Sequence, residues 1–154
     1  VSNNGFQYTA PEVTQSIKTG VLETDSDIIS YYLEGLKDAN SFNINHKLYL
    51  TVSHNSKSER EYITANLCNK WGRCEPLKED GSSNELELKP LSSSASNCSS
   101  FTCDFSESLE IELTDEFLKD QINKGVSINL ISKKKSHKIK ISIPYLMGYL
   151  SSIK

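Results

Sequence analysis

The sequence predicts a mainly β protein with two short helices, folded as an antiparallel β-sandwich or a partly open barrel with the helices packed at an edge. Three observations predict this class. Apolar and polar residues alternate in about eight short segments, which is the period of a half-buried strand. Only two segments, both near the C-terminus, have a helical period. The strands do not alternate with helices, as they do in a parallel βαβ sheet.

The length of 154 residues suits one domain that spans the whole chain. Residues 1–27 are weakly patterned and predict a loosely ordered N-terminal arm that contains a first strand at Val13–Lys18. A chain of this length buries about two-thirds of its unfolded surface, so it can fold without a cofactor or a metal.

Three strands are expected next, joined as an antiparallel meander. Residues 28–34 and 46–52 alternate clearly, and residues 60–67 form the returning strand. Turn-forming residues fill the segments between them, 38–43 and 53–59.

The second half of the chain predicts four more strands. Residues 85–89 alternate, and the serine-rich segment 92–96 has the composition of a linker. Residues 109–113 form the next strand, and segments 126–131 and 138–143 form a hairpin.

Two helices complete the expected elements. Thr114 can cap the first helix, with Asp115 and Glu116 in the first turn, and Gly125 suits its C-terminal end. Pro144 suits the first turn of the second helix. The apolar stripe of that helix consists of Leu146, Tyr149, Leu150 and Ile153. Its spacing of i, i+3, i+4 and i+7 requires a surface to cover.

Four cysteines occur in two short pairs, Cys68/Cys74 and Cys98/Cys103. Two disulfides, structural zinc and free thiols are the alternatives. Structural zinc sites usually have C-x(2–4)-C pairs, often with histidine. Cys98/Cys103 has the widest such spacing, Cys68/Cys74 exceeds it, and no histidine lies near either pair. We therefore expect disulfides, which place the protein in an oxidising compartment. Of the three connectivities, pairing within each loop is expected, because both loops can turn back on themselves.

Several residues of the C-terminal half carry a resemblance. They form the run Cys98-x4-Cys103-x-Phe105-x-Glu107 and the ending Ile143-Pro144-x4-Gly148-x-Leu150. This pattern resembles a group of small uncharacterised exported proteins of Gram-negative bacteria, many of them described as lipoproteins. The resemblance implies export and the same fold class, and it implies no activity.

The resemblance continues upstream with two departures. Tyr62-x-x-Ala65 is similar to the W-x-x-Y-x-x-A pattern of the group, but Glu59 stands where the group has an aromatic residue. The loop between Cys68 and Cys74 looks like an addition.

The overall charge and the absence of known motifs exclude several partners. A net charge of −3 provides no basic face for nucleic acid. No apolar run reaches the ~18 residues of a transmembrane segment, and a lipid anchor upstream of residue 1 stays open. Among seven glycines there is no phosphate-binding loop, so no cofactor is expected.

No residue is expected to be catalytic, and no metal site is expected. His46, His54 and His137 lie at a strand start, a turn and a hairpin, where histidines are usually solvated. Glu107 is expected to anchor the cysteine loop by accepting backbone N–H groups, rather than to act as an acid. An enzyme would instead be favoured by a cleft that holds at least two residues of one set, buried and hydrogen-bonded to each other. The set is His46, His54, His137, Glu107 and Glu59.

The remaining charged residues predict surface contacts. Glu110 and Glu112 are expected on an outer strand face, paired across strands with Lys138 and Lys140.

Two loops predict a binding surface. Trp71 and Arg73 lie in the first cysteine loop, as a contact site or as a lid over the core. Lys133, Lys134 and Lys135 form a basic hairpin tip that is either solvated or bound to an acidic partner or a phospholipid headgroup.

These observations favour a non-catalytic binding or structural module of the bacterial cell envelope, with an unknown envelope or extracellular partner. The expected location is the periplasm or the outer membrane, or outside the cell. The alternatives are an enzyme whose site is assembled from scattered loops and a secreted effector domain.

Overall fold

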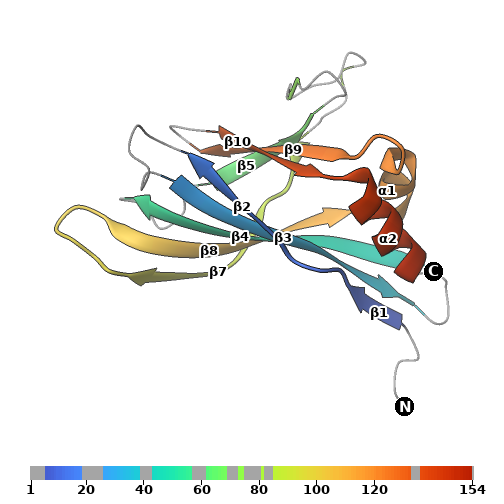
Figure 1. Cartoon of the computed structure of the whole chain (residues 1–154), viewed down its shortest axis with the longest axis horizontal. Coiled ribbons are helices and arrows are strands. Elements are labelled where there is room, and N and C mark those ends of the chain that lie inside the picture. The colour runs from blue at the N-terminus through green and yellow to red at the C-terminus, as the bar shows by residue number, and fades with distance from the viewer. Residues whose placement is uncertain are drawn as a thin grey trace.

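Two antiparallel sheets pack face to face in the computed structural model, and both helices lie at one end of them (Figure 1). Neither sheet closes on itself, so the predicted fold class is confirmed as a sandwich rather than a barrel. The structure describes residues 6–18, 26–38, 43–56, 62–68, 73–74, 81, 85–132 and 136–153. Within these residues, neither helix has the length and apolar character needed to cross a bilayer.

The larger sheet has the strand order β1-β3-β4-β8-β7, with β2 also paired to β3. Its strands are β1 (Phe6–Thr9), β2 (Val13–Lys18), β3 (Ser26–Lys37), β4 (Ile44–Ser56), β7 (Lys89–Ser96) and β8 (Cys103–Leu113). Strands β1 and β2 pair with different stretches of β3, so together they form one interrupted edge. The residue pattern predicts β2 but not β1.

The smaller sheet has the order β10-β9-β5-β6. Its strands are β5 (Tyr62–Leu67), β6 (Glu85–Leu86), β9 (Val126–Ser132) and β10 (Ser136–Ile141). The expected meander of three strands is therefore wrong in its last member, because β5 pairs with β9 and β6. The physical reason is that β8 occupies the edge of β4 along its length from His46 to Ser56.

The serine-rich segment 92–96 was expected to be a linker, and this expectation is wrong. It belongs to β7, which pairs with β8 and is exposed along its whole length. Strand β8 begins at Cys103, earlier than the alternation indicated, and its edge offers hydrogen-bonding partners to the serine backbone. A strand whose two faces meet solvent needs no apolar side chains, so a propensity argument misses it.

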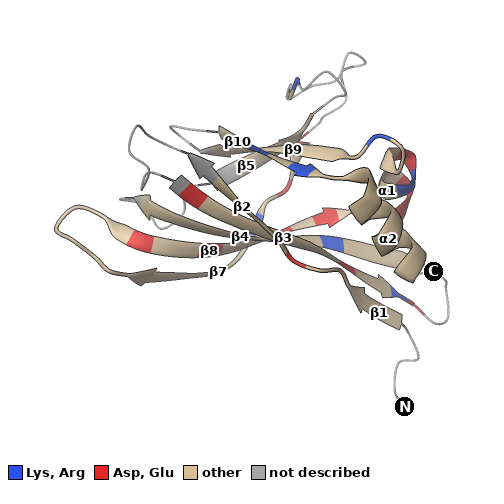
Figure 2. Cartoon of the chain, in the orientation of Figure 1, with Lys and Arg blue, Asp and Glu red and all other residues tan. Residues whose placement is uncertain are grey.

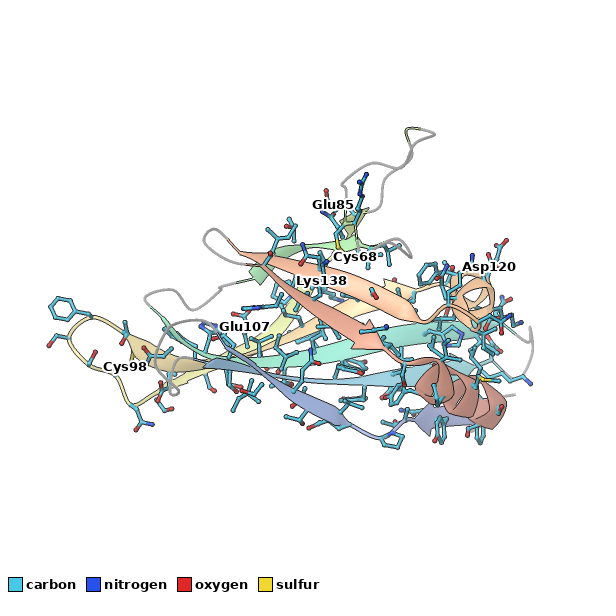
Figure 3. The ribbon with its side chains drawn as sticks, turned by 45° about the horizontal axis from the view of Figure 1, so that its top comes forward. Cys68, Glu85, Cys98, Glu107, Asp120 and Lys138 are labelled. Carbon is cyan, nitrogen blue, oxygen red and sulfur yellow. A yellow bond between two sulfur atoms is a disulfide. The ribbon has the colours of Figure 1, made fainter. Side chains whose placement is uncertain are left out.

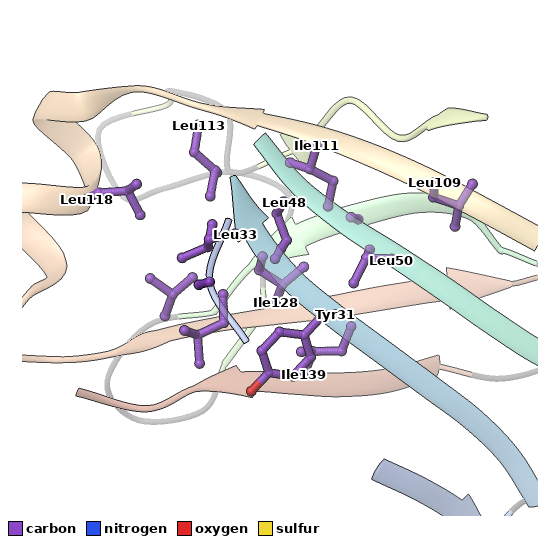
Figure 4. Packing of buried hydrophobic residues seen from close by; sticks show 14 of the residues in the cluster. Tyr31, Leu33, Leu48, Leu50, Leu109, Ile111, Leu113, Leu118, Ile128 and Ile139 are labelled. Atoms are coloured by element: carbon purple, nitrogen blue, oxygen red, sulfur yellow. The ribbon is translucent and has the colours of Figure 1, made fainter. Parts of the chain in front are cut away.

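The core lies between the two sheets (Figure 4). Alternate residues of the facing strands point into it, as the period of two requires. The buried residues of the larger sheet include Leu33, Leu48, Leu50, Val52, Leu109 and Ile111, and those of the smaller sheet include Ile128, Leu130, Ile139 and Ile141. The hydroxyl of Tyr31 also donates a hydrogen bond to the carbonyl of Lys140, which links β3 to β10.

Both helices form as predicted. Thr114 caps α1 (Asp115–Gln121), and its side chain accepts a hydrogen bond from the N–H of Phe117. Gly125 follows with a φ of 77°, a conformation that favours glycine. Helix α2 (Ile143–Ile153) buries the expected stripe of Leu146, Tyr149, Leu150 and Ile153.

Tyr145 on α2 fills the interruption between β1 and β2. Its hydroxyl donates to the carbonyl of Pro11 and accepts from the N–H of Leu33, at 2.8 and 3.2 Å. That N–H lies where the neighbouring strand is broken, so the tyrosine supplies the bond that a continuous strand would have made.

Replacing Gly35 with alanine is expected to lower the free energy of unfolding by about 1–3 kcal/mol, the usual cost of overpacking. A methyl group there would lie 2.9 Å from Ile153 Cδ1 and would collide with the Tyr149 hydroxyl. Urea denaturation measures the effect. Gly148→Ala is the matched control, since nothing lies within 4 Å of its added methyl and alanine favours the helix. Equal stability of the two variants would contradict the expected clash.

Candidate functional site

A network of hydrogen-bonded side chains, here named the His46 network, lies at the helical end of the sandwich. His46, near the start of β4, has Nδ1 2.6 Å from the Tyr149 hydroxyl and Nε2 2.7 Å from Asp115 Oδ1. Lys119 Nζ lies 2.7 Å from the second oxygen of Asp115. The His46 network thus joins β4 to both helices. Because an ionised carboxylate only accepts, Nε2 of His46 donates to Asp115, and the other ring nitrogen, Nδ1, shares a hydrogen bond with the Tyr149 hydroxyl.

The charges in the His46 network follow from its surroundings. Burial raises the pKa of Asp115, but the hydrogen bonds from Lys119 and His46 outweigh it and leave the pKa lowered. Burial, reinforced by the negative charge of Asp115, raises the pKa of Tyr149. Asp115 is therefore ionised and Tyr149 protonated near neutral pH.

A pocket of about 210 Å³ lies beside the His46 network, between the start of β4 and the two helices. Its lining residues are Ile44, Asp115, Lys119, Ile122, Leu150 and Ile153. Four of these six side chains are aliphatic, and the two charged ones are paired with each other. The pocket therefore suits an apolar group of modest size.

A second histidine–carboxylate pair occupies the other end of the core face of β4. His54 Nε2 lies 2.9 Å from Glu107 Oε2, and the His54 ring contacts Phe105 at a centroid distance of 5.7 Å. The strand register places Val52 opposite Glu107, so His54 and Glu107 are diagonal neighbours on β4 and β8. Glu107 thus hydrogen-bonds a histidine side chain inside the sandwich, a contact that its residue pattern does not predict.

The third histidine lies between the two sheets. His137 on β10 has Nε2 3.6 Å from Asp27 Oδ2 on β3, and both residues are buried. All three histidines were expected to be solvated, and this expectation is wrong for each. The signal that could have found them is parity, since His46 and His54 keep the period of two with the buried residues Leu48, Leu50 and Val52.

The buried histidine–carboxylate pairs differ in their access to solvent. His54 and Glu107 meet two conditions expected of catalytic groups, burial and mutual hydrogen bonding. Their side chains, however, are 0 and 2% exposed, so no substrate reaches them in this conformation. Of the residues in the His46 network, only Asp115 and Lys119 line the pocket.

The expected pairing of Glu110 with the lysines of the C-terminal hairpin is wrong. Strand β8 lies between β4 and β7, whereas Lys138 and Lys140 belong to the other sheet. Glu110 is buried, 3.0 Å from Lys47 Nζ and 3.8 Å from Lys89 Nζ. The hydrogen bond to Glu110 and its negative charge raise the pKa of Lys47.

Both predicted disulfides form, pairing Cys68 with Cys74 and Cys98 with Cys103. Two disulfides fit an oxidising compartment. The second one closes the far end of the β7–β8 hairpin, at the opposite end of the molecule from the helices (Figures 1 and 3).

Residues 97–102, here named the hairpin tip, hold Phe101 with 79% of its surface exposed. The tip has a defined local structure. The Ser99 side chain accepts hydrogen bonds from the N–H groups of Phe101 and Thr102, and the N–H of Ser99 donates to the Thr102 carbonyl. Asn97 takes a φ of 49°, which turns the chain out of β7. An exposed aromatic ring is thus held on a closed, hydrogen-bonded loop.

The base of the tip is also fixed. The carboxylate of Asp104 accepts hydrogen bonds from the side-chain amides of Asn55 and Asn97, which lower its pKa. The first of these amides comes from β4, so the hairpin is braced against the neighbouring strand.

The binding surface expected from the sequence is only partly described. Trp71, the segment Lys133, Lys134 and Lys135, and Glu59 lie outside the described residues. Arg73 is exposed and lies beside the disulfide-bonded Cys74. Phe101 and the pocket are functional features that the sequence motifs do not predict, although an aromatic residue between two closely spaced cysteines is itself a signal.

The chain matches no protein-family model, no curated protein and no solved structure. Its function is therefore inferred from its own geometry.

Proposed function

We propose that this chain is a non-catalytic binding or structural module of a bacterial cell envelope, and that it contacts its partner through the hairpin tip. The observation that carries the proposal is the exposed ring of Phe101 on a loop closed by the Cys98–Cys103 disulfide. The two disulfides support export, and the periplasm or the outer membrane is the proposed location.

A contact role accounts for the construction of the tip. Large aromatic side chains contribute much of the binding energy at protein interfaces. Holding such a residue in one conformation before binding reduces the entropy lost on association. The disulfide, the Ser99 hydrogen bonds and the Asp104 brace all act in this way.

The edge of β7 is a poorer contact than the tip. Open edges can pair with a strand of another chain, but proline and bulges interrupt such pairing. Strand β7 contains Pro90, and its register to β8 shifts between Pro90 and Ser92.

The His54–Glu107 pair is closed to solvent, so the enzyme alternative rests on the His46 network, which runs from Tyr149 through His46 to Asp115 and lies beside a pocket. Two features favour a structural role for the His46 network. The Tyr149 hydroxyl and the His46 ring are buried, and both oxygens of Asp115 are already engaged by His46 and Lys119. The His46 network therefore supports the attachment of the helices to β4.

A photo-cross-linking experiment tests the contact. The photoreactive residue benzoylphenylalanine is placed at position 101, and in a control at position 91, in cells of the bacterium that makes the protein. Leu91 is an exposed apolar residue of the same hairpin but lies away from the tip. We expect a discrete adduct from position 101 that is at least fivefold weaker from position 91. Equal adducts at the two positions, or none at 101, would remove the proposal.

A further inference from the structure

We propose that the partner of the hairpin tip is a second copy of this chain, whose pocket between β4, α1 and α2 receives Phe101. The inference rests on the proposed function, because it names the partner of the same tip.

The two elements lie at opposite ends of an elongated molecule. In Figure 3 the label of Cys98 marks the end that carries the hairpin tip, and that of Asp120 marks the helical end. The pocket belongs to the helical end, because Asp115, Lys119 and Ile122 line it. A tip-to-pocket contact between copies is heterologous. One such contact leaves a free pocket on one copy and a free tip on the other, so further copies can add head to tail.

Size and polarity match at this contact. An apolar cavity of about 150 Å³ lined by aliphatic side chains binds benzene. The pocket here, at about 210 Å³, has room for a phenyl ring among Ile44, Leu150 and Ile153. At 79% exposure, Phe101 has most of its ring available to be buried there.

The polar parts of the two surfaces also fit. The hairpin tip contains asparagine, serine and threonine beside Phe101 and no charged residue (Figure 2). The pocket presents one carboxylate and one ammonium group that already form an ion pair. Docking therefore sets no unpaired charge of the tip against Asp115 or Lys119, and it leaves hydroxyl groups able to hydrogen-bond to them.

A membrane is the weaker candidate for the same tip. Membrane-surface segments combine several apolar residues with lysine or arginine. The hairpin tip has one aromatic residue and no cation.

The contact is small, so the association is weak. One aromatic ring and its loop bury less than the roughly 1,200–2,000 Å² of a stable complex. We expect dissociation constants of about 10–500 μM, so the chains associate appreciably only where the protein itself is concentrated.

Sedimentation of the whole oxidised chain, from about 5 μM to 1 mM, tests the inference. Wild type is expected to form dimers and longer species as its concentration rises. Phe101→Ala removes the ring and Ile122→Trp fills the pocket, and each should weaken association at least tenfold. Leu91→Ala, the matched control, should associate like wild type. Ile44→Trp replaces Ile122→Trp if that variant shows an altered circular dichroism spectrum.

Mixing the two variants gives the sharpest outcome. The pocket of the Phe101→Ala chain is intact, and so is the tip of the Ile122→Trp chain, so the mixture should form a one-to-one dimer and nothing longer. A wild type that stays monomeric to 1 mM, or association that both variants leave unchanged, overturns the inference. In that case, a position-101 adduct whose mass differs from two chains shows that the proposed function holds with another partner. Absence of that adduct shows that both fail.

Discussion

Deleting residues 145–154 is expected to leave a chain without a cooperative unfolding transition at 25 °C. Four side chains of this segment, Leu146, Tyr149, Leu150 and Ile153, are at most 4% exposed. Burying each contributes about 1.5–3 kcal/mol, so their loss removes about 6–12 kcal/mol. A domain of this size has about 5–15 kcal/mol in total. The deletion also removes the Tyr145 hydroxyl, which bonds both β3 and the segment between β1 and β2.

Thermal melting followed by circular dichroism measures this effect. Met147→Ser is the control, because Met147 lies on the same helix and is half exposed. Its melting temperature should stay within a few degrees of wild type. A truncated chain that melts like wild type would show that α2 is not part of the cooperative fold.

The helix could be predicted because its information is local. Its stripe repeats at the helical period, and Pro144 marks its first turn. The same holds for α1, where the residue predicted to cap the helix, Thr114, makes the expected hydrogen bond. Where a short pattern both defines an element and requires a buried face, the sequence is enough.

Strand pairing could not be predicted in the same way. Strands 46–52 and 60–67 follow each other in the chain, and neighbours in sequence often pair. Here β8 pairs along β4 instead, which joins residues from 47 positions apart (Ser56 and Cys103) to 67 positions apart (His46 and Leu113). The alternation in β5 fixes which of its faces is buried, but it does not say which sheet the strand joins.

The functional features failed to appear for a related reason. The pocket is assembled from β4, α1 and α2, so its residues share no motif. The position of the histidines at turns and strand starts predicts that they are solvated, whereas the alternation of His46 and His54 with the apolar residues of β4 indicates that they are buried. His54 continues the buried series of Leu48, Leu50 and Val52, and a longer strand was the better inference.

The buried pair that this parity produces has a large expected effect on stability. His54→Leu is expected to lower the free energy of unfolding by about 3–5 kcal/mol, the usual cost of removing one partner of a buried polar pair. The substitution takes away the ring nitrogen that lies 2.9 Å from Glu107, a carboxyl group 2% exposed. Glu107→Leu should cost a similar amount, because it removes the acceptor from a fully buried imidazole.

The double variant His54→Leu/Glu107→Leu separates the pair from the shape of its surroundings. Two aliphatic side chains at diagonal positions of β4 and β8 extend the apolar face and remove both members of the His54–Glu107 hydrogen bond together. We therefore expect the double variant to lie within about 1–2 kcal/mol of wild type, far from the sum of the single changes. Urea denaturation of all four proteins measures the coupling, with Glu112→Ala on the exposed face of β8 as the control. Additive losses would mean that His54 and Glu107 stabilise the fold independently, through other contacts.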